Sequence, residues 1–152
     1  MKINNGFSLI ELLITIILLA ILITLASPDL SAFIRNHVLK SNSSKLFQAL
    51  TLARTEAILR NEIITVCGTE DFKHCSSTWN RGYIILIENK PDHIPLFSEA
   101  FSDPISLQDN GLVKISFTGE GRALSRGKLA FKTPEKASHQ IVIFDSGRIR
   151  LG

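Results

Sequence analysis

The N-terminal part of the chain contains one long apolar run. From Phe7 to Ala26 the only charged side chain is Glu11, and the fifteen residues from Leu12 to Ala26 include only two polar ones. As a helix rising about 1.5 Å per residue, a run of about 20 residues is roughly 30 Å long, the thickness of bilayer hydrocarbon. The pattern predicts a membrane-spanning helix over residues 7–28, with a bend at Pro28, which lacks a backbone N–H.

A second helical pattern follows, with polar and apolar positions on opposite sides. Apolar residues recur at spacings of four, three and four, at Leu46, Leu50, Ala53 and Ala57. Charged residues available for the other side are Lys45, Arg54, Glu56 and Arg60. This spacing predicts an amphipathic helix over residues 29–61. We expect one interruption, at Lys40–Lys45, because its Ser and Asn residues weaken helix propensity.

After the helix the pattern changes to short β-branched or aromatic runs separated by Gly, Pro, Asn and Asp. The predicted strands are Glu62–Cys67, Gly82–Glu88, Leu112–Thr118, Lys128–Thr133 and Gln140–Phe144. Residues 89–111 contain three prolines and are the most loop-like part, with at most a short strand at Leu96–Phe101. The fold class is therefore α+β: a long N-terminal helix packed on a small antiparallel β-rich domain over residues 62–152.

Charge is distributed unevenly along the chain. Lys and Arg number six against three Asp and Glu in residues 1–60, three against eight in residues 61–110, and eight against three in residues 111–152. A basic C-terminal block favours either a polyanionic partner or an ordinary solvated strand face.

The two cysteines flank a polar segment suited to a turn. Cys67 and Cys75 enclose Gly68–His74, and on the outer side of a membrane they are expected to form a disulfide. The alternative is a metal site that also uses His74, but three ligands without a fourth are incomplete for structural zinc. We therefore favour the disulfide and predict no metal site.

Motifs of catalysis are not found in the sequence. It has no nucleophile elbow, P-loop, dinucleotide glycine pattern or zinc-protease spacing, and Gly119–Arg122 is typical of a hairpin turn. The four histidines are scattered, and Trp79 is expected to pack in the core instead of stacking on a nucleobase. The sequence predicts neither an enzyme nor a cofactor.

An ordinary secretory signal peptide is one explanation of the N-terminus, with cleavage near Ala26. Against it, the apolar run is long, and a carboxylate at Glu11 costs roughly 2.5 to 3.5 kcal/mol or more in a bilayer. The segment Gly6–Leu12 instead resembles the N-terminal signal of type IV pilins and pseudopilins. The resemblance implies that residues 1–6 are a leader cut off after Gly6 by a prepilin peptidase, that the new amine of Phe7 is methylated, and that Glu11 pairs with the N-terminal amine of a neighbouring subunit in the filament.

The rest of the chain is similar to the FimT, FimU and GspH group of minor pilins and pseudopilins. The similarity lies in Cys67–Trp79, in Gly82–Ile87 and in Asp145–Arg150, although Tyr83 occupies a position where many relatives have tryptophan. It implies a type IV pilin-like fold and other pilins as partners. The implied location is the bacterial inner membrane, crossed once with the C-terminal domain in the periplasm, and then a filament at the cell surface.

The basic C-terminus offers candidate DNA contacts. In an extended segment, Arg148 and Arg150 point to one side while Ile149 and Leu151 anchor the other, and Gly147 permits a sharp turn before them. Guanidinium groups bind phosphates bidentately, although charge on an edge strand also keeps it from aggregating. This GRxR sequence resembles the motif of FimT-type minor pilins that bind DNA during natural transformation. Further support is expected from Arg122, Arg126, Lys128, Lys132 and Lys136.

Two functions follow from these features. The first is a minor pilin that binds the phosphate backbone of double-stranded DNA without reading its sequence. The second is a structural minor pilin or GspH-like pseudopilin that initiates or caps a pilus or a type II secretion pseudopilus and touches no DNA.

Overall fold

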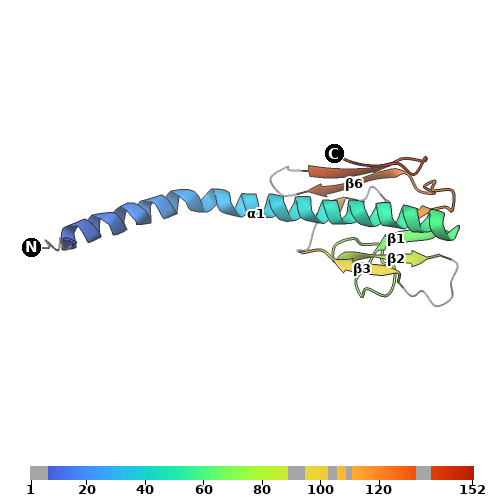
Figure 1. Cartoon of the computed structure of the whole chain (residues 1–152), viewed down its shortest axis with the longest axis horizontal. Coiled ribbons are helices and arrows are strands. Elements are labelled where there is room, and N and C mark those ends of the chain that lie inside the picture. The colour runs from blue at the N-terminus through green and yellow to red at the C-terminus, as the bar shows by residue number, and fades with distance from the viewer. Residues whose placement is uncertain (1–6, 89–94, 103–105, 109–110, 133–137) are drawn as a thin grey trace, which may run out of the picture. The chain divides into compact units, whose positions relative to one another are not determined.

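The structure is a computed structural model of the whole chain. It describes residues 7–88, 95–102, 106–108, 111–132 and 138–152. The chain divides into two compact units, residues Met1–Arg35 and Asn36–Gly152. The helix α1 (Leu9–Arg60) begins in the first unit and ends in the second (Figure 1).

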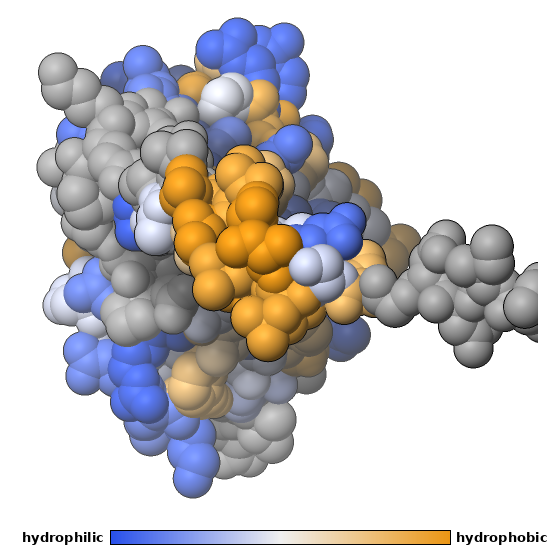
Figure 2. Space-filling view, turned by 90° about the vertical axis from the view of Figure 1, so that its left-hand side faces the viewer, coloured by the Kyte–Doolittle hydropathy of each residue, from blue (hydrophilic) through white to orange (hydrophobic). Residues whose placement is uncertain are grey.

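The first unit contains the start of α1. Its described side chains between Phe7 and Thr24 are all exposed, and hydrophobic side chains gather at this end of the chain, in orange in Figure 2. Within the described residues, no helix is long and apolar enough to count as a membrane span. The membrane-spanning segment over residues 7–28 and the bend at Pro28 therefore stay predictions.

The second unit contains the amphipathic part of α1. All four residues of the predicted apolar stripe, Leu46 to Ala57, are fully buried, which confirms the pattern. The predicted interruption at Lys40–Lys45 is wrong, because α1 is continuous there. Asn42 and Ser43 are buried in contact with the domain, and the Asn42 side-chain oxygen accepts a hydrogen bond from the Ser102 N–H at 3.2 Å. Tertiary contacts thus outweigh the weak helix propensity of these residues.

A backbone cap ends α1 at Arg60. Asn61 takes a positive φ of 53°, and its N–H lies 3.4 Å from the Ile58 carbonyl oxygen. The Glu62 N–H donates to the Ala57 carbonyl at 3.2 Å. This pair of bonds satisfies the last helical carbonyls and turns the chain into the first strand.

In the part of the chain that the structure describes, eight strands form two antiparallel sheets of four. The first, sheet A, has the order β3-β2-β1-β5 and is built from β1 (Ile64–Gly68), β2 (Gly82–Ile87), β3 (Phe97–Ala100) and β5 (Lys114–Phe117). The second, sheet B, has the order β4-β6-β7-β8 and is built from β4 (Ser106–Gln108), β6 (Gly127–Lys132), β7 (Ser138–Ile143) and β8 (Ile149–Leu151). The predicted strands are present, and β4 is an additional strand in the region expected to be loop-like.

One hydrophobic core joins both sheets to the C-terminal half of α1. Figure 1 shows this half running between β6 on one side and β1, β2 and β3 on the other. The core contains the inward-facing residues of the helix stripe together with Ile64, Val66, Ile85, Ile115 and Phe117 of sheet A and Leu129, Phe131, Ile141 and Ile143 of sheet B. Trp79 is also buried there and donates its indole N–H to the Leu112 carbonyl at 2.9 Å, which confirms its predicted packing role.

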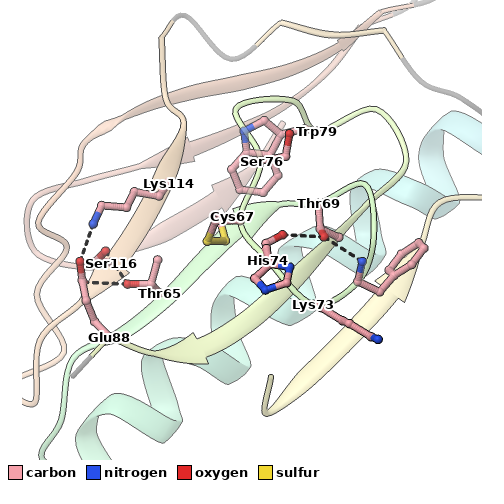
Figure 3. The surroundings of a disulfide bond; sticks show 12 residues. Thr65, Cys67, Thr69, Lys73, His74, Ser76, Trp79, Glu88, Lys114 and Ser116 are labelled. Atoms are coloured by element: carbon pink, nitrogen blue, oxygen red, sulfur yellow. Dashed lines mark hydrogen bonds and ion pairs between the residues drawn. A yellow bond between two sulfur atoms is a disulfide. The ribbon is translucent and has the colours of Figure 1, made fainter. Parts of the chain in front are cut away.

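The outer face of sheet A is covered by the loop that follows β1. Cys67 and Cys75 form a disulfide with their Cα atoms 5.5 Å apart, and the bond ties this loop to the sheet (Figure 3). Cys67, Ile84 and Leu86 form a second, smaller buried cluster beneath the loop. The disulfide prediction is confirmed, and the zinc alternative is wrong because each thiol is bonded to the other.

Candidate nucleic-acid interface

The register of sheet B places basic residues from separate strands on one face. In β6 the inward residues Leu129 and Phe131 are buried, while Lys128 and Lys132 are exposed on the opposite side. Lys128 pairs with Val142 of β7, which pairs in turn with Arg150 of β8. Directly paired residues share a face of the sheet, so Lys128 and Arg150 belong to the same outer surface.

The dimensions of this surface follow from strand geometry. Neighbouring strands lie about 4.8 Å apart, so the backbones at Lys128 and Arg150 are roughly 10 Å apart. Lys132 is four residues along β6 from Lys128, which is roughly 13 Å. Among the described residues, the rows of β6, β7 and β8 on this side contain no Asp or Glu side chain. We call the surface formed by Lys128, Lys132, Arg148 and Arg150 the basic face.

Arg148 is held by contacts within its own turn. Its guanidinium carbon lies 4.5 Å from the centre of the Phe144 ring, and its carbonyl accepts the Phe144 N–H at 3.0 Å. Stacking on the ring orients the planar group while leaving its N–H donors available. The residue itself is exposed, as expected for a phosphate contact.

The anchoring expected from the apolar residues of β8 is half right. Ile149 is partly buried and packs against the core, whereas Leu151 is 36% exposed. Leu151 pairs with Ile141, but β8 is the edge strand of sheet B and no described strand lies beyond it to cover this side chain. Ile149 is therefore the anchor of this strand.

Gly147 is required by the turn that leads into β8. It is buried and has a φ of 75°, a conformation that costs little only for glycine. A side chain at this position would overlap the carbonyl oxygen of Gly121. The Gly147 N–H donates to the Phe144 carbonyl at 2.8 Å, closing the turn predicted from the sequence.

Arg54 also contributes to the turns beside the basic face, although the sequence placed it only on the polar side of a helix. Its Nε donates to the Gly121 carbonyl at 2.9 Å, and its Nη2 donates to the Ser146 carbonyl at 3.4 Å. These partners are 67 and 92 residues away in the chain. Only the folded arrangement brings them together.

The other predicted basic residues differ in their surroundings. Arg126 is exposed and forms an ion pair with Asp145 at 3.2 Å. Arg122 is exposed in the turn between β5 and β6 and lines a groove with Glu120 and Asp145. Nearby carboxylates reduce the positive potential at both arginines, so we do not include them in the basic face. Lys136 lies outside the described residues.

The charged groups on sheet A are paired with one another. Glu88 accepts hydrogen bonds from Lys114 and from the Thr65 hydroxyl, and the Thr65 oxygen lies 2.9 Å from Glu88 Oε2 (Figure 3). The Lys114 bond, followed by the Thr65 bond, holds the pKa of Glu88 below its usual range despite partial burial. This cluster borders a cavity of about 320 Å³ beside the disulfide loop, whose lining includes Leu86 and Cys75.

Other ionisable groups also have shifted pKa values, among them Asp71 and Tyr83. Asp71 accepts hydrogen bonds from the His74 ring and from two backbone N–H groups, which hold its pKa well below the usual range. Burial, together with a 2.6 Å bond to Glu99, raises the pKa of Tyr83 far above its ordinary value. Glu99 is paired with Lys45 of α1 at 2.9 Å, so this set fastens the helix to sheet A.

The predicted assembly residues lie at the start of the first unit. Phe7 is 71% exposed, and Glu11 is exposed in the first turn of α1, where a carboxylate is favourable for the helix dipole. Gly6 lies outside the described residues. The roles of these residues in processing and assembly stay predictions.

Two family models match separate parts of the chain. Residues 42–147 match the model of a family described as type II transport protein GspH, and residues 1–27 match the prokaryotic N-terminal methylation motif. No curated protein sequence is significantly similar to the chain.

Solved structures share the fold. One crystal form of the type IV minor pilin FimU of Pseudomonas aeruginosa (strain PAO1) is 21% identical with a TM-score of 0.60, covering 74% of this chain and 91% of that one. A second crystal form is 20% identical with a TM-score of 0.63, covering 79% and 92%. At this identity, the likeness demonstrates the type IV pilin-like fold predicted from the sequence.

Proposed function

The chain belongs to the family of the type II transport protein GspH, and from this premise we propose that it acts as a DNA-binding minor pilin of a type IV pilus. It binds the backbone of double-stranded DNA without reading its sequence and promotes DNA uptake during natural transformation, as FimT-type relatives do. The observation that carries the proposal is the basic face, on which Lys128 and Lys132 of β6 lie on the same side as Arg150 of β8.

The chemistry of the face fits a phosphate backbone better than bases. Its span of roughly 10 to 13 Å is close to the width of the DNA major groove, about 12 Å, so its cations can reach phosphates on both sides of a groove. Among the described residues, Phe144 has the only aromatic ring beside the basic face, and the Arg148 guanidinium lies over that ring. A stacking platform for unpaired bases would need an open ring, so duplex DNA is the better ligand.

Features of the N-terminus support a location first in the inner membrane and later in a filament. The methylation motif covers the leader, which a prepilin peptidase removes after Gly6 before the amine of Phe7 is methylated. The exposed apolar side chains of residues 7–24 need a nonpolar surrounding, first the inner membrane and then the helices of other pilins. Glu11 pairs with the N-terminal amine of a neighbour. The disulfide fits a domain in the periplasm and later at the cell surface.

A second function is favoured by one observation on sheet A. Leu52 of α1 is exposed and lines a groove with Leu96 and Phe97, at the start of the edge strand β3. An exposed apolar patch of this kind is typical of protein contacts. In this alternative the chain is a structural minor pilin or pseudopilin that initiates or caps a filament and binds only other subunits.

The experiment that separates the two functions is a salt titration of duplex binding. Full-length protein in detergent is mixed with fluorescent duplex DNA, and affinity is measured by anisotropy at several salt concentrations. Each phosphate contact contributes a slope of about −0.9 in a plot of log affinity against log salt. We expect the Arg148→Gln/Arg150→Gln variant to bind weakly with a slope less steep by about 2.

The matched control removes two cations elsewhere. Arg60→Gln/Lys73→Gln has the same net charge as the double variant of the basic face, but both residues lie outside that face and are exposed. It should keep the slope of the wild type. Equal losses in the two variants would indicate attraction to overall charge only. No binding by the wild type at low salt would favour the structural function.

A further inference from the structure

Two turns meet at the C-terminal end of α1, and Arg54 joins them. One turn, between β5 and β6, contains Gly121, and the other, between β7 and β8, contains Ser146 and Gly147. Arg54 donates to carbonyl oxygens in both, at 2.9 and 3.4 Å. The Ala123 N–H also donates to the Asp145 carbonyl, at 3.2 Å, so backbone and side chain together link the turns.

We propose that Arg54 is a positioning residue for the basic face: it fixes the turn before β8 so that Arg148 and Arg150 are held in place before DNA arrives. The inference rests on the proposed function, because it assigns to Arg54 a part in that DNA site without direct contact to the ligand. Arg54 is half-buried, and its Nε and Nη2 donate to protein carbonyls. These donors are therefore used within the protein and are not directed at a ligand.

The two turns pack closely against each other and against α1 at two glycines. Gly121 and Gly147 are both buried with positive φ angles, of 74° and 75°. An added Cβ at Gly147 would overlap the Gly121 carbonyl oxygen and lie 3.0 Å from Arg54 Nε. An added Cβ at Gly121 would lie 2.7 Å from Ile58 of α1. The two glycines let the turns approach, and the guanidinium satisfies the carbonyls that this approach leaves facing the helix.

Arginine suits this place for a geometric reason. Two carbonyls on different turns need two donors held in one plane, and the guanidinium provides them from a rigid group. Lysine offers one ammonium centre with a different reach, so it keeps the charge but does not reproduce the two directed bonds. Without Arg54 the turn at residues 145–148 would lose a hydrogen bond that holds it in place. DNA binding would then have to order this turn.

The consequence for binding is specific. Ordering flexible groups on association weakens affinity without changing the contacts made in the complex. The number of phosphate contacts, which sets the salt slope, is determined by Arg148, Arg150 and the lysines of β6. Loss of a positioning residue therefore lowers affinity at unchanged slope, whereas loss of a contacting residue changes both.

The test uses full-length protein in detergent with Arg54→Lys, Arg54→Gln and the control Arg60→Gln, which removes a cation from the same helix. Duplex affinity is measured across salt, and hydrogen exchange is followed by mass spectrometry for residues 117–124 and 141–152. We expect both Arg54 variants to exchange faster in these segments and to bind roughly five- to tenfold more weakly, since the turn must be ordered on binding. Their salt slopes should equal that of the wild type, and Arg60→Gln should match it throughout.

Two results would overturn the proposal. A slope less steep by about 0.9 in Arg54→Gln would mean that Arg54 itself contacts a phosphate. Unchanged exchange in both variants would mean that the turns do not depend on it. If Arg54→Gln fails to fold, as seen from the fluorescence of the buried Trp79, the milder Arg54→Lys decides. If the wild type binds no DNA, the proposed function fails, while faster exchange in the variants would still show that Arg54 orders the turns.

Discussion

Within the described residues the two sheets have the same number of strands and share one core with α1, but only sheet A has its outer face covered. On sheet A every residue of β1 and β2 is buried, because the disulfide loop covers the side that α1 does not. On sheet B the strand β6 alternates between buried and exposed residues, and its outer side is open at Lys128 and Lys132. An antiparallel sheet can present one face to water, so the open face needs no cover for stability.

This difference between the outer faces assigns stability to sheet A and binding to sheet B. The covered face of sheet A carries a small cluster of buried apolar side chains and the ion pair of Lys114 with Glu88. The open face of sheet B carries cations without carboxylates in the same described rows. Substitutions on sheet A should therefore change the free energy of unfolding, and substitutions on the open face of sheet B should change binding to anions.

The largest effect is expected from a matched pair of truncations. Ile84 of β2 and Val142 of β7 both occupy outer faces of central strands, but only Ile84 is fully buried. Ile84→Ala should lower the free energy of unfolding by about 2 to 4 kcal/mol, because it leaves a cavity under the loop. Val142→Ala should cost below about 1 kcal/mol. Chemical denaturation followed by Trp79 fluorescence measures both free energies of unfolding. Equal losses of stability in the two variants would refute the claim that only the outer face of sheet A is covered.

Reduction of the disulfide should have the next largest effect. Opening the bond between Cys67 and Cys75 frees a short loop, and the chain-entropy estimate for this loop length is about 2 to 3 kcal/mol of stability. The unfolding midpoint is compared with and without dithiothreitol. Duplex affinity should not change in the reduced, still folded protein, because the loop lies on sheet A.

The control for reduction is the Cys67→Ala/Cys75→Ala variant. It lacks the cross-link from the start, so dithiothreitol should leave its stability unchanged. Weaker DNA binding by the reduced wild type would mean that the two sheets are coupled, against the separation argued above.

A smaller effect is expected from acid. The pKa of Glu88 is lowered in the folded chain, chiefly by Lys114, from a usual value of 4.5. A lowered pKa contributes stability that is present above the unfolded value and is lost as pH falls through the folded one. The unfolding free energy should therefore decrease below about pH 4.5, and Glu88→Gln should remove part of that decrease, under about 1 kcal/mol because the pair is partly exposed. If the unfolding free energies of the wild type and Glu88→Gln depended identically on pH from pH 7 to pH 3, Glu88 would not be the source of this effect.

The sequence predicted those parts of the fold that depend on local pattern. The stripe from Leu46 to Ala57 and the alternation in β6 follow directly from helix and strand periods. The break expected at Lys40–Lys45 was wrong because propensity is a weak preference, and burial of Asn42 and Ser43 against the domain overrides it. The strand β4 was missed because it lies in the proline-containing stretch 89–111, whose composition is typical of a loop.

The candidate site was predictable in its residues but not in its geometry. A period of two placed Arg148 and Arg150 on one side, and the positive φ at Gly147 agrees with the turn expected there. The pairing of Lys128 with Arg150 through Val142 depends on strand order, which one sequence does not give. The contacts of Arg54 span 67 and 92 residues, so they follow from the tertiary fold and from no local signal.

The smallest expected effect tests whether the basic face extends beyond the terminal arginines. Lys128 on sheet B and Lys73 on the loop of sheet A are both exposed lysines, and replacing either by glutamine should leave the unfolding free energy within about 0.5 kcal/mol. Lys128→Gln should make the salt slope of duplex binding less steep by about 0.9, because one phosphate contact is lost. Lys73→Gln should keep the wild-type slope. If Lys128→Gln also keeps it, DNA contacts only the end of β8, and the lysines of β6 are ordinary solvated residues of an open sheet.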